Sequence, residues 1–180
     1  MPDAASQTDI VIAGAARTPM GAFQGDLSAM AAPQLGGIAI KAALGDAGCA
    51  ADVVEEVLMG CVLPAGVGQA PGRQAGFAGG LGETVPASTV NKVCGSGMKT
   101  VMMAHDLIRA GSAGLVVAGG MESMTNAPYL SAATRGGARL GHAALKDHMF
   151  LDGLEDAYED GRLMGSFAEE CASRYQFSRE

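Results

Sequence analysis

The sequence predicts an α/β domain with a mostly parallel, mixed sheet. Short apolar runs without polar alternation recur along the first two thirds of the chain, and segments with helical spacing lie between them. Unbroken apolar runs are typical of strands covered on both faces, and strands alternating with helices favour parallel pairing through right-handed crossovers. Hydrophobic residues make up 48% and charged residues 17% of the 180 residues, which excludes a disordered chain.

We expect four strands and three helices in this apolar part. Each expected strand is a short apolar run that ends near turn residues. The first helix begins at Pro33 and ends at Gly48, in the position of a C-terminal cap. The expected strands are 10–16, 57–63, 88–93 and 115–118, with a glycine loop at 119–120, and the expected helices are 33–48, 73–81 and 96–110.

The composition changes after about residue 121, where polar turns and an acidic cluster replace the apolar runs. We therefore expect one domain over residues 1–121 and the start of a second over 122–180. From Met164 onward, apolar residues fall on one helical face and predict a packed amphipathic helix. The residues of that face are Phe167, Ala168, Cys171 and Tyr175.

Charge and motif content exclude several classes of function. The net charge of −7 and the pI near 4.9 argue against nucleic acid as a partner. No apolar run is long enough for a membrane span, and residues 1–8 do not resemble a signal peptide, so we expect a cytoplasmic protein. The four cysteines form no Cys-x-x-Cys pair, and no dinucleotide or phosphate loop motif is complete, so we expect neither a metal nor a permanently bound cofactor.

Cys94 is the candidate catalytic residue because it lies between an expected strand and the first turn of an expected helix. The unpaired amides of a helix start stabilise a thiolate and can hold an oxyanion, and Gly95 and Gly97 allow a substrate to approach closely. The helix dipole contributes at most about 2 kcal/mol, so a partner base is still needed. A small buried thiol at a helix start is an equally good interpretation of the residues alone.

The histidines are poor candidates for that base. His105 lies eleven residues after Cys94 on the same helix, about 16 Å along its axis. A buried core histidine is predicted by its helical spacing with Met98, Val101, Met102 and Ile108. His142 and His148 lie in the irregular region, where Asp147 is the only neighbouring carboxylate. The other cysteines, at positions 49, 61 and 171, are expected to be structural.

Several motifs, in order over nearly the whole chain, resemble the thiolase family, which includes acetyl-CoA acetyltransferases and 3-ketoacyl-CoA thiolases. The Gly-Ser-Gly-Met that follows Cys94 and the later Gly-Gly-Met-Glu-Ser are more similar to thiolases than to ketoacyl synthases. The resembling segments are Ala16-Arg17-Thr18-Pro19, Gly60 to Gly66 followed by Arg73-Gln74-Ala75, Asn91 to Met98, and Val117 to Met124.

The resemblance implies a ping-pong acyltransferase. Cys94 attacks an acyl-CoA, its backbone amide holds the oxyanion, and the acyl group passes to CoA or to the carbanion of a second acetyl-CoA. Coenzyme A is then a substrate. The resemblance further implies that the region after residue 121 begins a loop domain that covers the pantetheine arm, with Leu154 and Met164 lining the CoA tunnel. The resemblance also implies that the complete enzyme is a homodimer or homotetramer and that the helix after the nucleophile is partly buried.

The chain also departs from the thiolase pattern. Leu163-Met164 stands where biosynthetic members have His-Met, which leaves the acyl length open. The family's Asn-Glu loop, its Gly-His-Pro histidine and its second catalytic cysteine are absent from the 180 residues. We therefore expect little turnover without a C-terminal half. The alternative is a non-catalytic fragment that binds CoA or serves assembly.

Overall fold

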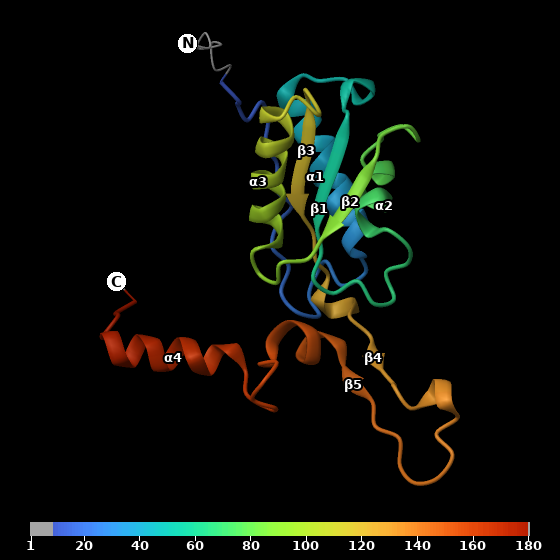
Figure 1. Ribbon diagram of the computed structural model, residues 1–180, viewed down its shortest axis with the longest axis vertical. Helices are drawn as coiled ribbons and strands as arrows, with labels where there is room; N and C mark the ends of the chain where they lie inside the picture. Colours follow the sequence, from blue (N-terminus) through green and yellow to red (C-terminus); the bar gives the residue numbers. More distant parts are fainter. Residues whose placement is uncertain (1–8, 180) are drawn as a thin grey trace, which may run out of the picture. The chain divides into compact units, whose positions relative to one another are not determined.

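The computed structural model describes residues 9–179 and divides into two compact units, Met1–Thr125 and Asn126–Glu180. Unit 1 contains a three-stranded sheet with the helices α1, α2 and α3 around it (Figure 1). Unit 2 contains a two-stranded sheet and the helix α4. Unit 1 confirms the predicted α/β class.

The sheet of unit 1 is parallel and has the order β2-β1-β3. The central strand β1 (Glu56–Gly60) pairs with β2 (Ala87–Val90) on one side and with β3 (Val116–Gly120) on the other. Because all three strands run in the same direction, their carboxyl ends meet at one edge, where Gly60 lies opposite the last residues of both neighbours. Ligands of such sheets usually bind beyond this edge.

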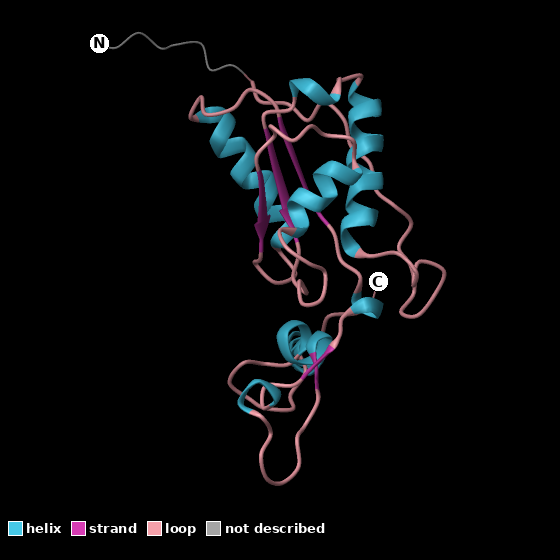
Figure 2. Cartoon of the chain, turned by 90° about the vertical axis from the view of Figure 1, so that its right-hand side faces the viewer, coloured by secondary structure: helices cyan, strands magenta, loops and turns pink. Residues whose placement is uncertain are grey.

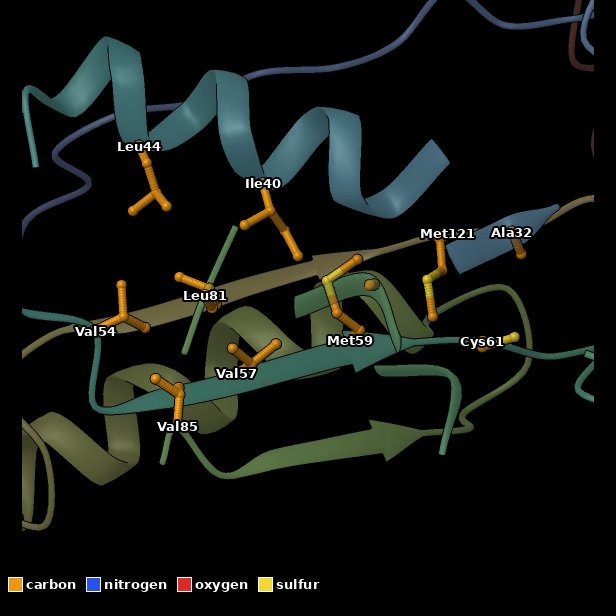
Figure 3. Close-up of a cluster of buried hydrophobic side chains, with 11 residues drawn as sticks. Ala32, Ile40, Leu44, Val54, Val57, Met59, Cys61, Leu81, Val85 and Met121 are labelled. Carbon is orange, nitrogen blue, oxygen red and sulfur yellow. The ribbon is translucent and has the colours of Figure 1, made fainter. Parts of the chain in front are cut away.

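Helices cover both faces of the sheet. Val57 and Met59 face the core formed with α1 (Ala32–Ala47) and α2 (Pro71–Ala78), which is drawn in Figure 3. Gly60, which alternates with them along the strand, faces α3 (Ser96–Arg109) instead. This arrangement confirms the three predicted helices of the apolar part, although α2 begins and ends earlier than expected.

The first helix follows the capping signals in the sequence. Pro33 lies in its first turn, and the Gln34 side chain accepts a hydrogen bond from the Ala31 amide at 2.8 Å. Gly48 ends the helix in the left-handed region at φ 63°, where glycine is favoured. Leu44, one turn before that end, points into the core (Figure 3).

The predicted strand over residues 10–16 is wrong. Ile12 is 80% exposed, and this segment makes no hydrogen bond to the described sheet. It runs instead along α1, where the Ala15 amide donates to Asp46 at 3.0 Å and Gly14 lies too close to Ala43 and Ala47 to carry a side chain. An apolar run becomes a strand only when a neighbouring strand accepts its backbone hydrogen bonds, and the described residues offer none here.

The other predicted strands exist but have different ends. β1 ends at Gly60, before the expected 63, and β2 ends at Val90, because the chain turns sharply before Cys94. The glycines expected as a loop, Gly119 and Gly120, are the last residues of β3. Glycine fits at the end of β3 because α3 approaches the strand closely at Gly97.

Unit 2 has short elements joined by long loops (Figure 2). Its strands β4 (Tyr129–Leu130) and β5 (Lys146–Asp147) pair antiparallel, and a turn of π-helix (Phe150–Leu154) leads toward α4 (Met164–Tyr175). The predicted helix after Met164 is confirmed, but its apolar face is not packed within the described residues. Ala168, Cys171 and Tyr175 are exposed, and Phe167 is only partly covered. No helix within residues 9–179 is long and apolar enough to cross a bilayer.

Candidate active site

Cys94 lies in a sharp, exposed turn between β2 and α3, at the carboxyl edge of the sheet. The residue before it, Val93, has φ 48°, in the left-handed region. A β-branched residue rarely adopts this conformation, which costs about 1–2 kcal/mol relative to an ordinary backbone. The surrounding contacts therefore have to hold the turn in place.

Two side chains supply those contacts. The buried Ser96 hydroxyl accepts a hydrogen bond from the Lys92 amide at 2.8 Å and donates to the Val93 carbonyl at 2.6 Å. The side-chain oxygen of Asn91 accepts a hydrogen bond from the Val93 backbone amide at 2.9 Å, and the side-chain nitrogen of Asn91 donates to the Val62 carbonyl at 3.3 Å. Val93 is thus bound through both its amide and its carbonyl group.

Close packing places the start of α3 against the sheet. A side chain at Gly60 would lie 2.7 Å from the Ser96 backbone, and one at Gly120 would lie 3.1 Å from Gly97. The Thr100 hydroxyl, which is fully buried, lies 2.7 Å from the Gly97 carbonyl and 2.8 Å from the Gly119 carbonyl. Glycines on the strands and small residues on the helix therefore fix where the helix begins.

The first turn of α3 carries no capping side chain, and its first helical hydrogen bond runs from the Lys99 amide to the Gly95 carbonyl. The Gly95 and Ser96 amides donate to the Lys92 and Val93 carbonyls, which leaves the Gly97 and Met98 amides as the unpaired backbone donors of the first turn, close in sequence to Cys94. Such amides carry partial positive charge and suit a thiolate or an oxyanion. The geometry confirms that Cys94 precedes the helix and does not lie within it.

The structure corrects the prediction for the residues that α3 buries. Residues spaced four apart, Ser96, Thr100 and Ala104, are buried against the sheet, whereas Met98, Val101 and Met102 are exposed. His105 is not a core histidine: its side chain is 51% exposed and lies 3.2 Å from Asp106. The helix approaches the glycines of the strands so closely that only small side chains fit between them.

Glu122, which the sequence analysis did not single out, forms the second cluster at this edge of the sheet. It follows β3, and its carboxylate accepts hydrogen bonds from the Val62 amide at 2.8 Å and the Leu63 amide at 3.0 Å. The buried Cys61 thiol also donates to it at 3.5 Å. Burial, and then the Glu122 charge, raise the pKa of Cys61 to about 12, so that Cys61 stays protonated at neutral pH.

A signal for Glu122 was present in the sequence. It directly follows an apolar run ending in Gly119 and Gly120, and another run ends near Cys61. Parallel strands bring such ends together, so a charged residue at this place has loop backbone within reach.

Comparison with known proteins identifies the family. Residues 10–180 match the family described as thiolase, N-terminal domain. The chain belongs to the thiolase family. It is 51% identical over 173 residues to an acetyl-CoA acetyltransferase of Cupriavidus necator and 52% identical over 172 residues to acetyl-CoA acetyltransferase 2 of Arabidopsis thaliana. These alignments cover 96% of this chain but 44% and 42% of the relatives.

A relative from Saccharomyces cerevisiae, also an acetyl-CoA acetyltransferase, shows 48% identity over 174 residues and 44% coverage of its length. The chain therefore spans less than half the length of these curated relatives.

The two residues predicted to line a CoA tunnel lie on neighbouring segments of unit 2. Leu154 ends the π-helix and Met164 begins α4. An antiparallel bridge between Glu155 and Leu163 brings the two segments together. Leu154 is partly buried, and Met164 is 39% exposed.

The ionisable groups of unit 2 pair differently from the prediction. His148 is buried and lies 2.6 Å from Asp152, while Asp147 accepts a hydrogen bond from the Met149 amide. The carboxylate paired with His148 is thus one helical turn away, not adjacent. Among the described residues, no group of three or more His, Cys, Asp or Glu side chains forms a metal site.

Proposed function

We propose that this chain forms the nucleophile-bearing part of a thiolase-type acyltransferase, with Cys94 as the residue that carries the acyl group. The observation that carries the proposal is the turn at Cys94. An exposed thiol lies before the uncapped start of α3, and buried hydrogen bonds hold it at the carboxyl edge of a parallel sheet.

The reaction begins when the Cys94 thiolate attacks the carbonyl carbon of an acyl-CoA. A carbon–sulfur bond forms, and the carbonyl oxygen becomes an oxyanion that the Cys94 amide, within the positive field of the α3 start, stabilises. The bond to the CoA sulfur then breaks, and CoA leaves as a thiolate that takes up a proton. The thioester on Cys94 passes its acyl group either to a CoA thiolate or to the carbanion of a second acetyl-CoA.

A general base must deprotonate Cys94 and the attacking substrate, and the described part of unit 1 offers none beside the thiol. His105 lies far along α3 and is paired with Asp106. We propose that a C-terminal part like that of the longer relatives supplies the base. The same proposal includes a domain division at 121 and a role for Leu154 and Met164 in lining a CoA tunnel. It also includes a dimeric or tetrameric assembly, a cytoplasmic location and a role in fatty acid metabolism.

The second candidate function is a non-catalytic fragment that binds CoA or serves assembly. The observation in its favour is the exposed apolar face of α3, on which Met98, Val101 and Met102 are 75%, 46% and 51% exposed. Such a face suits contact with another chain without any chemistry at Cys94.

Isotope exchange between acetyl-CoA and labelled CoA separates the two functions, because exchange requires an acyl-enzyme but no second acyl substrate. We would measure it for the chain alone and for the chain mixed with the remaining part of the Cupriavidus necator relative. We expect exchange in the mixture and little for the chain alone.

Two cysteine variants complete this experiment. Cys94→Ala removes the proposed nucleophile and should abolish exchange, whereas Cys171→Ala removes another exposed thiol, on α4, and should leave it unchanged. Exchange that survives Cys94→Ala contradicts the assignment of the nucleophile. Absence of exchange in every mixture supports the non-catalytic alternative.

A further inference from the structure

Glu122 and Asn91 are linked to the Cys94 turn by a continuous series of hydrogen bonds through the loop after β1. We propose that Glu122 is a positioning residue for Cys94 that acts through Val62, Leu63 and Asn91. This proposal rests on the proposed function, because it names a residue that sets the geometry of that nucleophile. It assigns no contact between Glu122 and the substrate.

The first link is the pair of hydrogen bonds by which Glu122 holds the loop after β1. One carboxylate oxygen accepts from the Val62 amide at 2.8 Å, and the other accepts from the Leu63 amide at 3.0 Å. Only an ionised carboxylate can accept at both oxygens without presenting a donor, so glutamine cannot replace Glu122 fully. The protonated Cys61 thiol adds a third donor to the same group.

The second link is a single peptide unit held from both ends. The Leu63 amide and the Val62 carbonyl belong to the same planar peptide group, in which they point in opposite directions. Glu122 accepts from its N–H group, and the Asn91 side chain donates to its C=O group at 3.3 Å. A rotation of this peptide unit that follows the loss of Glu122 therefore moves the acceptor that orients Asn91.

The third link runs from Asn91 to the turn. Its amide group is bound to the Val62 carbonyl, which leaves its oxygen to accept from the Val93 amide at 2.9 Å. The opposite assignment of the side-chain oxygen and nitrogen would break both bonds. Val93 has the strained φ of 48° and directly precedes Cys94, so any loosening here changes the direction in which the thiol points.

Glu55 provides a matched control because it makes the same kind of contact at the other end of the strands. It directly precedes β1, and its carboxylate accepts from the Gly114 amide, before β3, at 3.0 Å. Glu55→Gln thus removes a carboxylate that binds loop backbone without touching the edge where Cys94 lies.

The test compares Glu122→Gln, Asn91→Asp and Glu55→Gln in the full chain mixed with the remaining part of the Cupriavidus necator relative. Asn91→Asp keeps the acceptor for the Val93 amide and loses the donor to Val62. We would measure the rate of acetylation of Cys94 against acetyl-CoA concentration, and far-UV circular dichroism would show that each variant is folded. Alkylation of Cys94 by iodoacetamide would be measured on each chain alone.

We expect Glu122→Gln and Asn91→Asp each to lower the maximal acetylation rate roughly 10- to 100-fold, with little change in the half-saturating concentration, because a small displacement of a reacting atom is costly. The double variant should lose little more than either single one, since both act through one series of bonds. Glu55→Gln should acetylate at the wild-type rate, and the alkylation rate of Cys94 should fall in the Glu122 and Asn91 variants only.

Wild-type acetylation rates in Glu122→Gln would overturn the positioning role, as would equal losses in Glu55→Gln, which would indicate a general loss of stability. Fully additive losses in the double variant would also contradict it. Failure of the wild-type mixture to acetylate refutes the proposed function instead, and the alkylation rates then still decide whether Glu122 controls the position of Cys94.

Discussion

Gly60→Ala tests whether close packing against the sheet fixes the start of α3. The added Cβ would lie 2.7 Å from the Ser96 carbonyl carbon, 2.8 Å from the Gly97 amide nitrogen and 2.8 Å from the Ser96 Cβ, where 3.4 Å is an ordinary contact. Two of these three atoms are backbone, so the start of the helix has to retreat by roughly 0.7 Å because no flexible side chain can give way. Such overpacking costs about 1–3 kcal/mol, and the lower unfolded-state entropy of alanine offsets up to about 1 kcal/mol of it.

We therefore expect Gly60→Ala to lower the free energy of unfolding by about 1–2 kcal/mol and to slow acetylation of Cys94 by roughly tenfold or more. Urea unfolding followed by far-UV circular dichroism measures the first effect, because the chain has no tryptophan for fluorescence. Gly45→Ala is the control: it lies within α1, nothing lies within 4 Å of its added Cβ, and it should raise the free energy of unfolding by about 0.5–1 kcal/mol. Wild-type stability and wild-type acetylation in Gly60→Ala would refute the packing argument.

Three further changes test other parts of the structure. Thr100→Val keeps the shape but removes the hydroxyl beside the Gly119 carbonyl, so the free energy of unfolding should fall by about 1–2 kcal/mol in urea titrations, whereas Thr100→Ser should retain that contact. Because the pKa of Cys61 is raised from 9.0 to about 12, the folded chain holds this proton more tightly than the unfolded chain does. The contribution of Cys61 to the free energy of unfolding should therefore be fully present below pH 9 and be lost between about pH 9 and 12. Cys61→Ala should flatten that decline, and an unchanged slope would contradict the assignment. Arg162→Lys should speed amide hydrogen exchange at the start of α4, because lysine cannot bind both Glu159 and Glu170 as the arginine does; unchanged exchange would show that the pairs do not order this helix.

The sequence predicted the helices and the parallel sheet well because these depend on local signals. Pro33 and Gly48 mark the ends of α1, and the short, continuous apolar runs of β1 and β3 predict covered strands. The segment over residues 10–16 has the same local signal, yet it is not a strand. Whether this segment forms a strand depends on a neighbouring strand to pair with, and no local pattern predicts that neighbour.

The position of Cys94 before a helix was also predictable, since the glycines and the serine around it form a recognisable turn. What holds that turn was not. Glu122 reaches residues 61–63 across the sheet, and this contact follows from the strand order, not from spacing along the chain. The face that α3 buries was predicted wrongly because apolar spacing suggested Met98 and Val101, whereas the glycines of the strands leave room only for Ser96 and its small neighbours.

The role of Cys94 as the acyl carrier is tested most directly by tandem mass spectrometry of the chain after incubation with acetyl-CoA and the remaining part of a relative. We predict an acetyl thioester on the peptide that contains Cys94, and none on the peptides with the other three cysteines. Acetyl groups spread over several thiols, or found on Cys171 in place of Cys94, would contradict it.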